Sequence, residues 1–140
     1  LNLKDEKPKK IKEGKDLTII SSGYSTKLAK MAIDEISSSY PDKSIELIDL
    51  RIISPLDNSM IIESVQRTGS IMVIDGGWKT CGLGSEIISS VLENMDPSFL
   101  QKRPINISLK EAPAPSAKNL EDIYYTNVRD IVREIEKILR

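Results

Sequence analysis

Residues 70–86, SIMVIDGGWKTCGLGSE, contain the pattern that decides the fold of this chain. The stretch opens with an apolar run at 71–74, which is typical of a parallel strand covered by helices on both faces. A loop with four glycines and Trp78 follows, and an apolar helix is predicted next over residues 87–95. Because ligands and partners usually bind beyond the carboxyl ends of strands in open α/β sheets, a function is first expected at this loop.

Trp78, the only tryptophan, has two interpretations. A tryptophan beside a glycine-rich loop can anchor a protein partner, or it can cover the local core. The usual burial of large aromatic side chains favours the core role, so Trp78 is predicted to cap the local core.

Strands and helices alternate on either side of this stretch. Further strands are predicted at 17–21, 44–48 and 104–109, and a helix at 25–39 with Leu28, Met31, Ala32 and Ile36 facing the sheet. A second helix begins after Ser54 or Asp57 and ends at Gly69. Residues 110–122 are predicted to form a proline-containing surface loop, and the last helix follows Asn127, with Asp130 three residues on. This alternation predicts an α/β domain with a largely parallel sheet.

The composition excludes several classes of function. The 20 basic and 21 acidic residues nearly balance, so nucleic-acid binding is not predicted. No apolar run approaches the roughly 20 residues that a membrane span needs. The single cysteine, Cys81, fits a reducing, cytoplasmic compartment. The chain has no histidine, which excludes Ser-His-Asp and Cys-His catalysis by its own residues. It starts with Leu1 rather than methionine, so a piece of a longer polypeptide is expected, and this chain alone is not expected to be an enzyme.

No catalytic, cofactor-binding or metal-binding residue is predicted. The glycine-rich loop fails the dinucleotide fingerprint, which needs three glycines in the first strand–helix turn. Asp49 and Asp75 both follow strands and could form an acid–base pair, but structural roles are favoured, including a local ion pair between Asp49 and Arg51. Cys81 is predicted to be a small, partly buried thiol, and Glu86 is explained by its place in the first turn of a helix.

Four segments together resemble a known family. They are residues 13–20 (EGKDLTII), 48–57 (IDLRIISPLD), 75–87 (DGGWKTCGLGSEI) and 113–125 (PAPSAKNLEDIYY). The set resembles the C-terminal domain of the beta subunit of thiamine-diphosphate-dependent 2-oxoacid dehydrogenases, which include pyruvate, branched-chain 2-oxoacid and acetoin dehydrogenases. More broadly, it resembles the transketolase C-terminal domain superfamily. The resemblance runs from about residue 12 to the end of the chain.

The resemblance implies a three-layer α/β/α domain with a five-stranded, mixed, mostly parallel sheet. One edge strand is antiparallel, and the best candidate lies near residues 9–12, within a region 1–14 that otherwise reads as a linker to the domain at 15–140. Thiamine diphosphate and Mg belong to other domains of the parent enzyme, and none is expected to bind here.

The same resemblance implies a role in assembly. The domain pairs subunits, an alpha subunit and a second beta subunit, in a heterotetramer and helps to dock the dihydrolipoyl acyltransferase core. The residues expected at or near these interfaces are Asp75, Gly76, Gly77, Trp78, Gly82, Gly84 and Arg140.

One segment departs from the family pattern. Relatives often carry Leu-Asp-Ala-Pro at the start of the last strand, where this chain has LQKRP at 100–104. Lys102 and Arg103 replace the acid and would repel a basic docking domain. Two alternatives remain open: the C-terminal domain of a transketolase or deoxyxylulose-phosphate synthase, and an independent module that binds a small ligand or a protein.

Overall fold

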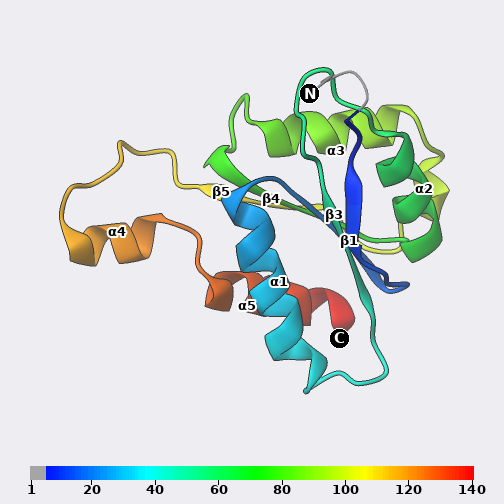
Figure 1. Cartoon of the computed structure of the whole chain (residues 1–140), viewed down its shortest axis with the longest axis horizontal. Coiled ribbons are helices and arrows are strands. Elements are labelled where there is room, and N and C mark those ends of the chain that lie inside the picture. Colours follow the sequence, from blue (N-terminus) through cyan, green and yellow to red (C-terminus); the bar gives the residue numbers. More distant parts are fainter. Residues whose placement is uncertain (1–5) are drawn as a thin grey trace.

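The computed structural model describes residues 6–140, so the first five residues of the predicted linker lie outside the described part of the chain. A five-stranded sheet forms the middle layer in the order β1-β3-β2-β4-β5 (Figure 1). β1 pairs antiparallel with β3, and all other pairs are parallel. The predicted fold class is confirmed, including the antiparallel edge strand. The strands are β1 (Lys9–Lys12), β2 (Leu17–Ser21), β3 (Ile45–Asp49), β4 (Ile71–Trp78) and β5 (Ile105–Leu109).

Helices cover both faces of the sheet and create two hydrophobic cores. One face is covered by α1 (Tyr24–Ser37) and α5 (Val128–Leu139), and the other by α2 (Ser59–Thr68) and α3 (Leu83–Glu93). A 3₁₀ turn, η2, follows at Pro97–Phe99. Every residue of the central strand β2 is buried, because helices pack on both of its faces. Its three large apolar side chains each stabilise the fold by about 1.5–3 kcal/mol.

The helical faces differ in places from the prediction. In α1 the buried residues are Ala29, Ala32, Ile33 and Ile36. They follow the i, i+3, i+4, i+7 spacing of one helical stripe, which leaves Met31 on the outer side with 49% of its surface exposed. The expectation that Met31 faces the sheet is therefore wrong.

Helix α2 begins later than expected. Its first residue is Ser59, so neither Ser54 nor Asp57 is its N-cap. Asp57 instead accepts a hydrogen bond from the Ser59 backbone N–H at 3.1 Å, a local turn that precedes the helix. Gly69 ends α2 in the left-handed conformation with φ 68°, as predicted. The capping box of Asn127 and Asp130 at the start of α5 is also confirmed.

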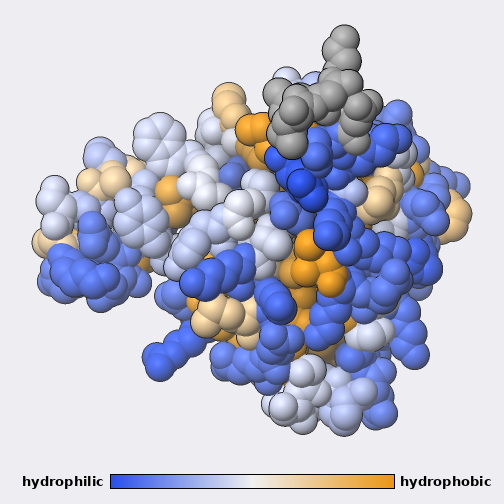
Figure 2. Space-filling view, viewed as in Figure 1, coloured by the Kyte–Doolittle hydropathy of each residue, from blue (hydrophilic) through white to orange (hydrophobic). Residues whose placement is uncertain are grey.

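The segment 110–127 forms an arm that stands out from the body of the domain (Figures 1 and 2). The arm contains α4 (Lys118–Tyr124), which corrects part of the prediction of a proline-containing surface loop at 110–122. α4 has seven residues and only one, Tyr124, is buried, so it leaves no periodic apolar pattern in the sequence.

A buried carboxylate joins β3 to two neighbouring elements near the amino ends of the strands. The Glu46 side chain has no exposed surface, and it pairs with Arg67 of α2 and with Lys10 of β1, whose Nζ lies 3.5 Å away. Beside it, the Thr18 hydroxyl lies 2.6 Å from that of Ser64 and 2.8 Å from that of Thr68. Burial opposes ionisation of Glu46, but the Ser64 hydroxyl and the Arg67 guanidinium outweigh it and lower the pKa of Glu46.

Candidate functional site

The carboxyl ends of the parallel strands surround a cavity of about 660 Å³, which we call the carboxyl-end cavity. β2 ends at Ser21, which is in register with Asp49 of β3 and Ile74 of β4. Loops after these strands and the end of the arm complete the walls. The lining residues are Ser22, Tyr24, Ser25, Leu28, Ile53, Asp75, Gly76, Gly77, Gly82, Leu83, Leu109, Tyr125 and Thr126.

β4 is longer than predicted and bulges where it meets the cavity. The strand was expected to end at residue 74, but it continues to Trp78. Ile74 is paired with Ile107 and Trp78 with Leu109, so the three residues between them on β4 face a single residue of β5. A bulge of this kind redirects side chains, and here it brings the Asp75 carboxylate over the start of α3.

Asp75 ties the glycine-rich loop to helix α3. Its carboxylate accepts hydrogen bonds from the backbone N–H groups of Gly77, at 2.9 Å, and Gly84, at 3.0 Å. Gly84 is in the first turn of α3, where a negative charge is favoured by the helix dipole. A Cβ on Gly82 would lie 1.9 Å from the Trp78 carbonyl oxygen, so the loop can close only with glycine at that position. Asp75 therefore has a structural role, as the sequence favoured.

Asp49 and Asp75 are not brought together as an acid–base pair. Asp49 ends β3 and Asp75 lies within β4, and these two strands flank β2 on opposite sides, so the two backbones are about 9 to 10 Å apart. Asp49 accepts a hydrogen bond from the Arg51 backbone N–H at 3.3 Å. The expected ion pair between Asp49 and Arg51 does not form, because the Arg51 guanidinium lies 3.0 Å from Glu6 instead.

Trp78 connects β4 to the arm and remains open to solvent. Its indole N–H donates to the Tyr124 hydroxyl at 3.0 Å, and that hydroxyl donates to the Ala112 carbonyl at 2.9 Å. Trp78 keeps 55% of its surface exposed and lines a hollow of about 400 Å³ with Thr80 and residues 111–113. The prediction that Trp78 caps the local core is wrong, because the arm binds the indole N–H while more than half of the side chain stays exposed.

Large apolar side chains gather around the cavity and along the arm. Tyr24 is 71% exposed and Ile53 55%, and both line the cavity. On the arm the exposed apolar residues are Leu120, Ile123 and Tyr125. Figure 2 shows hydrophobic surface among the hydrophilic residues of this arm. Exposed apolar surface grouped at one end of a domain is typical of a protein–protein contact.

Sequence reasoning did not identify Tyr24, Ile53 and Tyr125 as members of the site. The sequence did contain a signal for them. Each is a large, mainly apolar residue in a loop or at the start of a helix, where it does not belong to the apolar pattern of a buried helix face or strand. Their convergence on one cavity depends on the return of the arm to the end of β4, where Tyr124 meets Trp78, and no local pattern encodes this contact.

Arg140 lies away from the other predicted interface residues. α5 starts beside the cavity and runs about 18 Å to its other end, since it contains 12 residues. There the Arg140 side chain lies 3.7 Å from Glu136, in the same helix. The structure therefore groups Asp75, Gly76, Gly77 and Gly82 at the cavity, with Trp78 and Gly84 adjoining, and does not bring Arg140 to them.

The remaining candidate residues do not form a catalytic or metal-binding group within the described part of the chain. Cys81 is exposed and has φ 54°, so the expectation of a partly buried thiol is wrong. Glu86 lies in the first turn of α3, as predicted. Residues 6–140 contain no cluster of metal-ligating side chains. No helix within the same range is long and apolar enough to cross a membrane.

Comparisons with known proteins agree with this fold. Residues 6–131 match the family model for "Transketolase, C-terminal domain". The chain is 36% identical to the pyruvate dehydrogenase E1 component subunit beta of Rickettsia bellii over 94% of this chain and 40% of the relative. It is 33% identical to the corresponding subunit of Rhizobium meliloti over 89% of this chain and 26% of the relative. A solved structure described as "Split gene transketolase, inactive beta4 tetramer" superposes with a TM-score of 0.78 at 24% identity, over 95% of this chain and 42% of that one. The chain thus spans about two fifths or less of the length of these proteins.

Proposed function

The chain belongs to the family of transketolase C-terminal domains, and from that premise we propose that it is the assembly domain of a 2-oxoacid dehydrogenase beta subunit. The relatives named pyruvate dehydrogenase E1 beta support this assignment, since the similarity covers nearly all of this chain. In the proposed enzyme the domain contacts an alpha subunit and a second beta subunit in a heterotetramer. The contact is made by the carboxyl-end cavity and the arm.

The observation that carries this proposal is the exposed apolar surface at the carboxyl ends of the parallel strands. Trp78, Tyr24 and Ile53 each leave more than half of their surface exposed. Aromatic anchors beside a cavity are the residues that contribute most to protein–protein contacts. The neighbouring carboxylates make structural hydrogen bonds, so the same surface offers no acid–base pair for catalysis.

Thiamine diphosphate and Mg belong to the proposed parent enzyme and not to this domain. Within residues 6–140, the only loop with the glycines to approach a diphosphate is the one at 76–84. Its Gly77 and Gly84 N–H groups are already occupied by the Asp75 carboxylate, which would also repel a phosphate. The residues therefore do not fit the cofactor, and we place decarboxylation of the 2-oxoacid and acyl transfer to lipoamide on the rest of the enzyme.

Two finer parts of the proposal concern location and docking. A single exposed cysteine suits a reducing compartment, so we place the enzyme in the cytoplasm. The assembled enzyme docks on a dihydrolipoyl acyltransferase core. The segment at 101–103 is not assigned to that contact, because its cations would repel a basic docking domain.

The proposal is tested by shortening Trp78 in the full-length beta subunit. Sedimentation velocity with the alpha subunit should show that Trp78→Ala weakens the heterotetramer at least tenfold, since an aromatic anchor contributes about 2 kcal/mol or more. Phe99→Ala is the matched control, because Phe99 is an equally apolar side chain, 45% exposed, in η2 outside the cavity. Unchanged assembly and thiamine-dependent decarboxylation in Trp78→Ala would refute the interface.

A further inference from the structure

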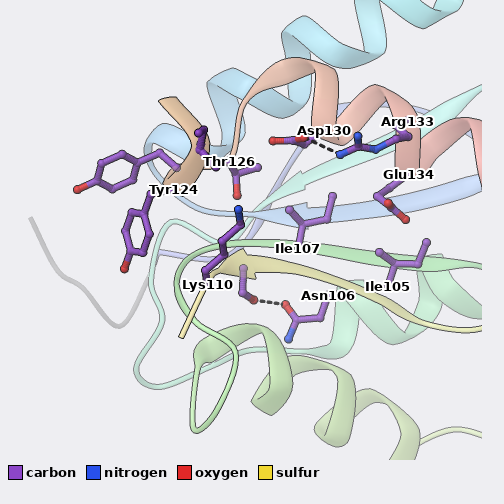
Figure 3. A pocket seen from close by; sticks show the side chains of 12 residues that line it. Ile105, Asn106, Ile107, Lys110, Tyr124, Thr126, Asp130, Arg133 and Glu134 are labelled. Atoms are coloured by element: carbon purple, nitrogen blue, oxygen red, sulfur yellow. Dashed lines mark hydrogen bonds and ion pairs between the residues drawn. The ribbon is translucent and has the colours of Figure 1, made fainter. Parts of the chain in front are cut away.

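The outer edge of β5 has no strand beside it within residues 6–140. β5 pairs with β4 only, and all five of its residues are half-buried, in contrast to the fully buried β2. Figure 3 shows Ile105 and Ile107 pointing from β5 toward α5, while Asn106 points to the opposite side of the strand. An edge strand of this kind presents outward N–H and C=O groups with which another extended chain can pair.

A groove runs along this edge between β5 and α5. It is formed by two hollows of about 450 and 460 Å³, which share Ile105, Asn106 and Glu134. We call this feature the β5 groove. The basic side chains that line it are Lys79, Lys102, Arg103, Lys110, Arg133 and Lys137.

The β5 groove carries positive charge that the described chain does not neutralise. Its two acidic residues are both engaged, Asp130 with Arg133 at 2.7 Å and Glu134 with Lys137 at 2.6 Å. The other four basic residues form no ion pair with any residue of 6–140; they are Lys79, Lys102, Arg103 and Lys110. In a chain whose total charge is nearly balanced, this is a local excess.

The opposite edge of the sheet provides a contrast. Strand β1 is also rich in lysine, but Lys10 lies 3.5 Å from Glu46, and Lys12 lies 3.5 Å from Asp34. Acidic groups of the chain itself therefore neutralise two of the three lysines of β1. At β5 the corresponding acidic groups must come from another molecule.

We propose that the β5 groove binds an extended acidic segment of a partner protein, which adds as a sixth strand along the outer edge of β5. The backbone of the segment pairs with β5, and its acidic side chains meet the cations at the two ends of the strand, Lys102 and Arg103 before it and Lys110 after it. Apolar side chains at alternate positions contact Ile105 and Ile107, because successive residues of a strand point to opposite faces.

Two other occupants are disfavoured by the same observations. A second copy of the chain would bring the same unneutralised cations into the groove, and like charges repel. A nucleic acid would neutralise the cations but could not pair with the outward N–H and C=O groups of β5. This inference rests on the groove alone and does not require the proposed assembly role.

Binding is measured with a fluorescein-labelled peptide of alternating Glu and Val, using fluorescence anisotropy and the 140-residue chain. Lys102→Glu combined with Arg103→Glu is expected to weaken binding at least tenfold. Lys27→Glu combined with Lys30→Glu is the matched control, since both lysines are exposed on α1 outside the groove, and it should bind normally. A peptide of alternating Lys and Val should not bind.

Strand addition itself is measured on the unaltered chain, so the test does not depend on a variant that folds. The Glu–Val peptide should slow hydrogen exchange of the outward-facing amides of β5, and N-methylation of alternate peptide residues should abolish both binding and protection. The proposal is overturned if charge reversal leaves binding unchanged, or if β5 gains no protection. It is also overturned if a short single-stranded oligonucleotide binds more tightly than the peptide, or if β5 is instead covered by self-association.

Discussion

Replacing Asp75 by asparagine removes the charge that holds the glycine-rich loop against α3, with almost no change in side-chain volume. The native carboxylate accepts two backbone hydrogen bonds, from Gly77 at 2.9 Å and from Gly84 at 3.0 Å. An asparagine side chain has one acceptor oxygen, so its amide nitrogen must face one of these two donors. The loop next to Trp78 should loosen as a result.

The expected cost follows from the two hydrogen bonds. A hydrogen bond to a charged group contributes about 1.5–3 kcal/mol, and a neutral one about 0.5–1.5 kcal/mol. The variant loses one charged bond and exchanges the other for a neutral one. Because Asp75 is only half-buried, solvent reduces the loss, and we expect Asp75→Asn to lower the free energy of unfolding by about 2 kcal/mol. This is about a 30-fold change in the unfolding equilibrium.

Urea unfolding followed by circular dichroism measures this cost, and hydrogen exchange locates it. The amides of Gly77 and Gly84 should lose protection, while those of β2 should change only by the global loss in stability. Asp42→Asn is the matched control, because Asp42 is exposed between α1 and β3, and it should cost less than about 0.5 kcal/mol. Equal stability of the two variants would refute the structural role assigned to Asp75.

Three further changes test other parts of the structure. Glu46→Gln should cost about 2 kcal/mol at neutral pH, since it removes the buried carboxylate that pairs with Arg67 and Lys10, while solvent screens these two partly exposed cations. The lowered pKa of Glu46 means that its stabilisation is present above the ordinary value of 4.5 and is lost as the pH falls below it. The native chain should therefore lose more stability than the variant between about pH 5 and about pH 3. Parallel plots of unfolding free energy against pH for the two proteins would contradict this. Gly14→Ala should cost about 3 kcal/mol or more in urea unfolding, because the added Cβ would lie 2.2 Å from the Glu46 backbone nitrogen, and a small loss would show that this contact is not tight. Tyr124→Phe removes the hydroxyl between Trp78 and Ala112, so the tryptophan emission should shift to the red; an unchanged spectrum would mean that the arm is held otherwise.

The periodic parts of the chain could be predicted from sequence. The apolar runs at 17–21 and 71–74 are buried strands, and the stripe in α5 is buried at Ile131, Ile135 and Ile138. A strand buried on both faces of a sheet has a continuous apolar run, and a helix buried on one face has apolar residues three or four positions apart. Both patterns can be read from neighbouring residues of the sequence. The same reasoning failed at Met31. Helix α1 has more apolar residues than one helical face can hold, and the face that packs on the sheet contains Ala29, Ala32, Ile33 and Ile36 but not Met31.

Features that depend on distant contacts could not be predicted. Glu46 lies inside the predicted strand at 44–48 and is buried only because Arg67 and Lys10, from two other elements, neutralise it. Helix α4 is short and almost wholly exposed, so its sequence has no periodic signal. The exposure of Trp78 depends on the position of the arm, which binds the indole N–H through Tyr124 and leaves more than half of the side chain exposed.

Sedimentation velocity of this chain, mixed with the matching alpha subunit and the remainder of the beta subunit, tests the central claim most directly. The account predicts that the chain enters a heterotetramer and that thiamine-dependent decarboxylation is restored in the same mixture. A chain that sediments as a free monomer in the presence of both partners would contradict the assembly role and favour an independent binding module.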